Sequence, residues 1–101
     1  MRIISYCLLF LAFSLNGLHA QVLNGKVLDA STNEPVIGAN IVIKGTVNGT
    51  TTDINGNFSI KYNTLPFNIE CSYIGYKTST IEIKNNDEII NIILKDKISN
   101  F

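Results

Sequence analysis

The sequence predicts an all-β fold, an antiparallel β-sandwich of seven strands with Ig-like architecture. After residue 20 the chain is rich in Ile, Val and Thr, whose β-branched side chains pack well on a pleated sheet. Several short runs alternate apolar and polar residues with a period of two, and Gly, Asn or Pro separates them. Short strands spaced in this way are typical of a sandwich, and hairpins between them favour antiparallel pairing.

The first half of this region contains three expected strands. The first, residues 22–29, ends before Asn33-Glu34-Pro35, where the proline keeps the residue before it out of helical conformations. The second, residues 38–45, alternates apolar with mostly polar positions. Asn48-Gly49 then predicts a hairpin turn, because Asn and Gly both accept positive φ, and the third strand follows at residues 50–53.

The fourth expected strand, residues 57–62, follows a second turn signal at Asn55-Gly56. We expect the Asp53 carboxylate to accept backbone N–H bonds across this turn, and Phe58 to enter the core after it. The segment also partly resembles a calcium loop, but it lacks the acidic residue that closes an EF-hand loop. A hairpin turn is therefore the favoured interpretation, and no metal site is predicted.

Two further strands are expected at residues 67–74 and 76–84, with Gly75 permitting a sharp reversal between them. In the first of these, Cys71 and Tyr73 share the alternation phase of the inward-facing residues. We therefore interpret Cys71 as a small buried apolar residue, the alternative being a reactive thiol or an intermolecular disulfide partner.

The last expected strand, residues 88–95, is apolar on both faces. One face carries Ile90, Ile92 and Leu94, while Ile89 and Ile93 lie on the other. Such a strand is either covered on both faces or adhesive on one. Two alternatives remain open here: the segment Ile98–Phe101 covers the second face, or that face docks a neighbouring domain or subunit.

Residues 1–20 have the order of a secretory signal peptide. Arg2 precedes an apolar run at Cys7–Phe13 that is too short to span a bilayer, and Leu18-His19-Ala20 ends in a small residue. We expect cleavage after Ala20, export of the chain, a folded domain over residues 21–96 and a short tail over residues 97–101.

Removing that signal leaves little chemistry in the remaining chain. Residues 21–101 contain no His, no Arg and one Cys, and their seven Lys against eight acidic residues give a formal charge of −1. This composition excludes a Ser-His-Asp or Cys-His nucleophile system, a His/Cys zinc site and a basic nucleic-acid surface. We predict no enzyme activity, no catalytic, cofactor-binding or metal-ligating residues and no cofactor.

A set of short motifs runs in order through residues 22–95. The motifs are Gly25-Lys26-Val27-Leu28-Asp29, the run from Asn33 to Ile41, Lys44-Gly45-Thr46, Gly49-Thr50-Thr51-Thr52-Asp53, Asn55-Gly56-Asn57-Phe58 and Ser72-Tyr73-Ile74-Gly75-Tyr76. In this order and spacing they resemble the carboxypeptidase-regulatory-like domain, a seven-stranded sandwich of transthyretin-like type. They resemble the version found in Bacteroidetes-type envelope proteins, where it commonly lies N-terminal to TonB-dependent receptors.

The resemblance implies a structural or protein-interaction module of the periplasm or outer membrane. Its partner would be another envelope protein or a following receptor domain. Because the chain stops at Phe101, it is expected to be a stand-alone module, a truncated receptor or a remnant. A purine-ring-hydrolysing branch of transthyretin-like domains uses His and Arg, and residues 21–101 contain neither.

The competing function is a carbohydrate-binding module of starch-binding-like type. Tyr62, Tyr73 and Tyr76 are the candidate stacking platform for a sugar. Tyr62 and Tyr73 share the phase of core residues, so Tyr76, beside Gly75, is the one expected to be partly exposed.

Overall fold

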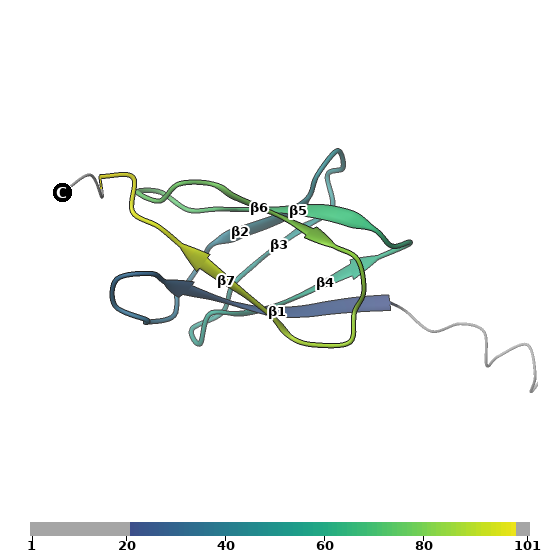
Figure 1. The fold of residues 1–101 in the computed structure, drawn as a ribbon, viewed down its shortest axis with the longest axis horizontal. Helices are drawn as coiled ribbons and strands as arrows, with labels where there is room; N and C mark the ends of the chain where they lie inside the picture. The colour runs from purple at the N-terminus through teal and green to yellow at the C-terminus, as the bar shows by residue number, and fades with distance from the viewer. Residues whose placement is uncertain (1–20, 99–101) are drawn as a thin grey trace, which may run out of the picture.

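A computed structural model describes residues 21–98, which fold into seven strands in two sheets (Figure 1). The strands are β1 (Gln21–Asp29), β2 (Asn40–Ile43), β3 (Gly49–Thr51), β4 (Asn57–Tyr62), β5 (Phe67–Ser72), β6 (Ser79–Ile83) and β7 (Ile90–Leu94). One sheet has the order β4-β1-β7 and the other the order β3-β2-β5-β6. The predicted all-β sandwich of seven strands is therefore confirmed. Residues 1–20, including the expected cleavage site after Ala20, and residues 99–101 lie outside the described part of the chain.

The core lies between the inward faces of the two sheets. Burial alternates along β4 with a period of two, so Phe58, Ile60 and Tyr62 are buried while the residues between them are exposed. The core is completed by one set of side chains from each sheet: Leu23, Val27, Ile92 and Leu94 from the first, and Ile41, Ile43, Ile69, Cys71 and Ile83 from the second. The inward positions predicted for Phe58 and Cys71 are confirmed.

Strand pairing is antiparallel in four of the five pairs and parallel in the fifth. β1 pairs with β4, β2 with β3 and β5, and β5 with β6, all antiparallel. The exception is β1 with β7, whose register places Val27 beside Ile92. A tight turn cannot join parallel strands. β1 and β7 are the first and last strands of the sandwich, so the whole of the intervening chain connects them.

The turn before β4 has the predicted form. Oδ1 of Asp53 accepts hydrogen bonds from the backbone N–H of Asn55 and of Asn57, both at 2.9 Å. The Gly56 N–H donates to the Asp53 carbonyl at 2.9 Å, and Gly56 adopts a φ of 78°. The predicted turn and the role of Asp53 in it are therefore confirmed, but the turn does not close a hairpin, because β3 and β4 belong to different sheets.

The hairpin predicted at Asn48-Gly49 is present, because β2 and β3 pair antiparallel, but these two residues do not form its turn. The connection between β2 and β3 reverses earlier, with Gly45 at a φ of 84° and the Thr46 N–H bonded to the Ile43 carbonyl. Gly49 already belongs to β3, and a Cβ there would lie 2.9 Å from the Ile41 carbonyl oxygen. This glycine therefore allows a close approach of two strands and does not form the turn.

The predicted inward position of Tyr73 is also wrong. β5 ends at Ser72, so the alternation does not continue, and Tyr73 is 37% exposed. The reversal expected at Gly75 is confirmed, because Gly75 has a φ of 89° and the Tyr76 N–H donates to the Tyr73 carbonyl.

Candidate functional site

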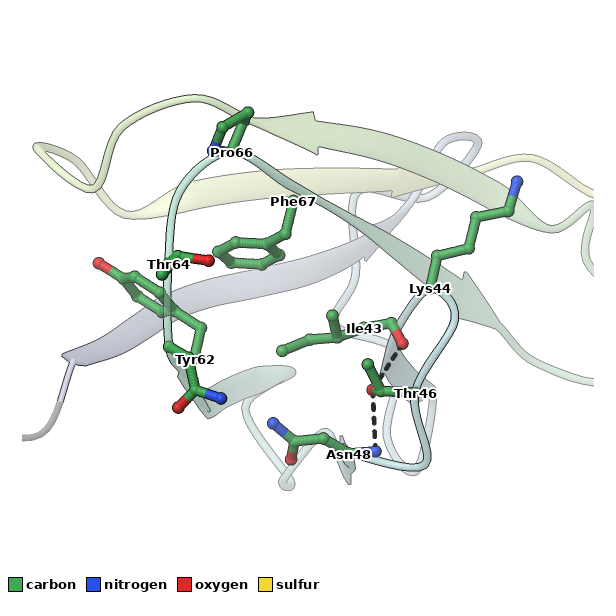
Figure 2. Close-up of a pocket in the computed structure, with 9 residues that line it drawn as sticks. Ile43, Lys44, Thr46, Asn48, Tyr62, Thr64, Pro66 and Phe67 are labelled. Carbon is green, nitrogen blue, oxygen red and sulfur yellow. Dashed lines mark hydrogen bonds between the residues drawn. The ribbon is translucent and has the colours of Figure 1, made fainter.

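A pocket of about 370 Å³ opens at one end of the sandwich, between the loops that join β2 to β3 and β4 to β5 (Figure 2). Its volume lies within the range of about 300–1,000 Å³ that is typical of small-molecule sites. We call it the loop-end pocket, and its lining consists of Ile43, Lys44, Thr46, Asn48, Tyr62, Asn63, Thr64, Pro66 and Phe67.

The apolar part of the loop-end pocket comes from strand ends. Ile43 is the last residue of β2, Tyr62 the last of β4 and Phe67 the first of β5. The rings of Tyr62 and Phe67 lie 4.9 Å apart at 33°, and Phe67 is only partly buried. The sandwich core therefore ends here in an aromatic surface that is open to the pocket.

The polar part is held in place by hydrogen bonds within the β2–β3 loop. Thr46 Oγ1 donates to the Ile43 carbonyl at 2.8 Å and accepts from the Asn48 N–H at 3.0 Å. Asn48 Nδ2 donates to the Lys61 carbonyl at 2.7 Å, which links this loop to β4. These hydrogen bonds hold the polar wall of the loop-end pocket in place.

A second hollow, of about 330 Å³, lies near the turn after β5, lined in part by Asp29, Tyr73 and Tyr76. Of its two carboxylates, Asp29 and Glu34, the first already accepts hydrogen bonds within the fold. Asp29 Oδ1 accepts from the N–H groups of Ser31 and Thr32, and Oδ2 accepts from the Tyr76 hydroxyl. The Tyr76 hydrogen bond, followed by the two backbone bonds, lowers the pKa of Asp29, and the same bond raises the pKa of Tyr76. Asp29 therefore ties the end of β1 to the β5–β6 connection.

The three tyrosines considered as a sugar-stacking platform do not form one. Tyr62 lines the loop-end pocket, whereas Tyr73 and Tyr76 lie at the other hollow. The rings of Tyr73 and Tyr76 are 6.0 Å apart and tilted by 41°, so they do not share a plane. The expectation that Tyr76 is partly exposed is confirmed.

Three apolar side chains lie on the outward face of the three-stranded sheet, with Asn91 of β7 and its partner Lys26 of β1 between them. Ile89, just before β7, is 67% exposed, and Ile93 within β7 is 45% exposed. Leu28 of β1 is paired with Ile93 and is partly exposed. Ile98 is itself 70% exposed, so the described part of the tail buries little. We call Leu28, Ile89 and Ile93 the outward β7 face; within residues 21–98 it is uncovered.

The single thiol after residue 20 is inert in this fold. Cys71 is fully buried, and burial raises the pKa of its thiol to about 11. Because an unfolded thiol has a pKa of about 8.5, the folded form retains a proton that the unfolded form releases between these values. This contribution to stability is therefore complete below about pH 8.5 and is lost as the pH rises toward 11.

The expected slope is a loss of roughly 1.4 kcal/mol of unfolding free energy per pH unit within that window. Urea denaturation at pH 8 and pH 10.5 measures it, with Cys71→Ala as the control, because that variant lacks the buried thiol and keeps every other group. If both proteins lost the same stability, the buried thiol would not be the cause. Slow labelling of Cys71 by a thiol reagent at pH 8 is expected for the same reason.

No group of three or more His, Cys, Asp or Glu side chains among residues 21–98 is arranged to hold a metal ion. The same part of the chain contains no helix with the length and apolarity needed to cross a bilayer.

Several residues of the loop-end pocket were not indicated by the sequence. The sequence places Asn48 in a turn, Phe67 at the start of a strand and Thr46 in one of the motifs of the family resemblance. Only Tyr62 was singled out as a possible ligand-contacting aromatic. No local signal could have found the pocket, because its two loops meet only through the pairing of β2 with β5.

The fold and the surface together define a small two-sheet β-sandwich module with an open pocket at one end and an apolar outward face. The sequence model of the CarboxypepD_reg-like domain matches residues 23–101, and the chain belongs to this family.

Similar proteins support this assignment. TonB-dependent receptor P39 of Formosa agariphila is 35% identical over 90% of the chain and 9% of its own length. TonB-dependent receptor SusC of Bacteroides thetaiotaomicron is 37% identical over 82% of the chain and 8% of its own length. The chain thus spans less than a tenth of these receptors. A chain in a type II cohesin–X-dockerin complex from Acetivibrio cellulolyticus shares the fold, with a TM-score of 0.60 and 21% identity over 75% of this chain and 58% of that one.

Proposed function

We propose that this chain is a non-enzymatic, exported module that binds another protein of the cell envelope. The observation that carries the proposal is the outward β7 face, where Ile89, just before β7, and Ile93 within it are exposed although the inward side of the strand is also apolar. Exposed apolar side chains on one sheet face are a candidate protein-interaction surface, which the proposal assigns to this face. The similarity to TonB-dependent receptors supports a place at the outer membrane.

The residues available support the non-enzymatic part of the proposal. Residues 21–101 hold no His or Arg, and the one thiol is buried with a raised pKa. A Ser-His-Asp or Cys-His nucleophile system therefore lacks its His in this part of the chain.

The proposed partner is a TonB-dependent receptor. In the relatives, the matching segment is part of one long receptor chain, so this module has a covalent neighbour there. A receptor surface that accommodates such a module would receive the outward β7 face of the present chain. Export to the periplasm and cleavage after Ala20 are part of the same proposal.

Replacing Ile89 and Ile93 together with Thr is expected to reduce the amount of co-purified receptor at least tenfold. Thr keeps the β-branched shape, and because both side chains are exposed, the unfolding free energy should change by no more than about 0.5 kcal/mol per site. The measurement is quantitative mass spectrometry of TonB-dependent receptors that are retained by tagged protein from solubilised outer membranes.

A matched control is the pair Val47→Thr and Ile74→Thr, which removes two other exposed apolar side chains in loops. This variant should retain the receptor as the unchanged protein does. Retention by the Ile89/Ile93 variant, or equal loss in both variants, would refute the assigned face. Unfolding of the Ile89/Ile93 variant would show instead that these side chains belong to the core.

A further inference from the structure

We propose that the loop-end pocket binds one ring of an uncharged saccharide, a site that is independent of the outward β7 face. The proposal depends on how the lining divides. Figure 2 shows the Phe67 ring and the Ile43 side chain on one side of the hollow, and Asn48 and Thr46 in the loop facing them. A sugar ring has the same division, since its C–H faces are apolar and its rim carries hydroxyl groups.

The apolar side offers a ring face. Phe67 is partly buried against the core and stacks on Tyr62 at 4.9 Å, so the aromatic pair is held at the pocket without being covered. The negative face of an aromatic ring attracts the weakly positive C–H groups of a sugar.

The polar side offers groups that have spare hydrogen-bonding capacity. The side chains of Asn63 and Thr64 make no hydrogen bond with any described residue, and Asn48 uses its Nδ2 but leaves Oδ1 free within residues 21–98. Amide and hydroxyl groups both donate and accept, as sugar hydroxyls do. An entirely apolar ligand would leave these groups without partners and would bind less well for that reason.

The charge of the lining favours a neutral ligand. Lys44 is its only charged residue, and Figure 2 shows the Lys44 side chain extending away from the Phe67 ring. A cationic ligand would find no carboxylate in the lining. A peptide strand is also disfavoured, because Asn48 already occupies the Lys61 carbonyl of β4, which such a strand would need as an acceptor.

The test is a titration of the purified full-length exported chain, followed by ¹⁵N–¹H NMR, with methyl β-D-glucopyranoside, methyl β-D-galactopyranoside and glucuronate as probes. At least one neutral glycoside should shift the amide signals of Thr46, Asn48, Thr64 and Phe67, with a dissociation constant on the order of 1 mM. The proposal would be overturned if no signal shifted at a glycoside concentration of about 50 mM, which is far above the expected dissociation constant. Shifts confined to the Tyr73–Tyr76 hollow would overturn it as well. Glucuronate binding more than about threefold tighter than the neutral probes would overturn the uncharged assignment.

Phe67→Leu is expected to weaken binding about fivefold or more, since it removes the ring face and keeps an apolar side chain. The matched control is Tyr73→Leu, because Phe67 begins β5 and Tyr73 follows its other end. This control should bind within twofold of the unchanged chain. Equal affinities of the two variants would overturn the assignment of the ring.

A second pair keeps the test valid if Phe67→Leu does not fold. Thr64→Val removes one hydroxyl group from an exposed loop residue, and valine has nearly the same shape as threonine. Thr80→Val makes the same change at an exposed residue of β6. Thr64→Val should weaken binding about threefold or more, whereas Thr80→Val should not. Unchanged affinity in Thr64→Val, together with unchanged shifts at the pocket, would count against the site.

Discussion

Replacing Gly56 with Ala is expected to lower the free energy of unfolding by about 2–5 kcal/mol. Gly56 has a φ of 78°, a conformation that costs other residues roughly 1–2 kcal/mol. A Cβ there would also lie 2.7 Å from the Val27 carbonyl oxygen and 2.8 Å from Cβ of Pro35. Relief of that overlap requires movement of the backbone of β1, which costs about 1–3 kcal/mol more.

Gly45→Ala separates the two causes. Gly45 has a φ of 84°, yet no atom lies within 4 Å of its Cβ position. Gly45→Ala should therefore lower the free energy of unfolding only by the cost of the positive φ, about 1–2 kcal/mol. Urea denaturation followed by circular dichroism measures both variants at one pH. Equal losses would mean that crowding against Val27 and Pro35 is absent.

The residues that carry the family resemblance are largely framework residues. The Gly56 carbonyl accepts a hydrogen bond from the Val27 N–H, and Asp53 closes the turn before β4. The Asp29 carboxylate accepts a hydrogen bond from the Tyr76 hydroxyl. Gly25 belongs to the same class, because a Cβ there would lie 2.2 Å from Cζ of Phe58. The resemblance therefore specifies a sandwich and its loops, and it carries no information on a ligand.

Local patterns were sufficient to predict the strands. Alternation with a period of two and a turn signal on each side are properties of a short stretch of chain, so β4 was located at both ends, at Asn57 and Tyr62. The Asp53 turn was predictable for the same reason, since the carboxylate bonds residues two and four positions ahead. The positive φ at Gly75 likewise followed from its place between two apolar runs.

Features that depend on distant segments were not predictable. The parallel pair of β1 and β7 joins opposite ends of the domain, and no periodicity encodes it. Tyr73 had the phase of a core residue, but β5 stops one residue earlier and the chain turns outward. At Asn48-Gly49 the hydroxyl of Thr46 organises a longer loop, in which Gly49 meets a neighbouring carbonyl.

The loop-end pocket shows the same limit at the level of function. Ile43 and Phe67 meet there because β2 pairs with β5, with Ile43 opposite Ile69. In the sequence, the aromatic residues that could contact a sugar are Tyr62, Tyr73 and Tyr76, and nothing there separates Tyr62 from the other two. The structure gives Tyr62 a different neighbour, Phe67, at the other end of β5.

Replacing Thr52 with Val is expected to cost about 2–4 kcal/mol of unfolding free energy. Thr52 is 5% exposed, and its Oγ1 accepts from the Ala39 N–H at 2.8 Å and donates to the Val36 carbonyl at 2.6 Å. Valine has nearly the same shape but offers no hydrogen bond. Two buried backbone groups would then lose their partners, at about 1–3 kcal/mol each before relaxation.

Two further variants show whether the hydroxyl or the methyl group matters. Thr52→Ser keeps the hydroxyl and loses one buried methyl, which should cost about 1 kcal/mol. Thr51→Val alters the exposed neighbour in β3 and should stay within about 0.5 kcal/mol of the unchanged chain. The expected order of loss, measured by urea denaturation, is therefore Thr52→Val, then Thr52→Ser, then Thr51→Val. If Thr52→Ser lost more than Thr52→Val, apolar packing and not the bridge from Val36 to Ala39 would hold this part of the sandwich together.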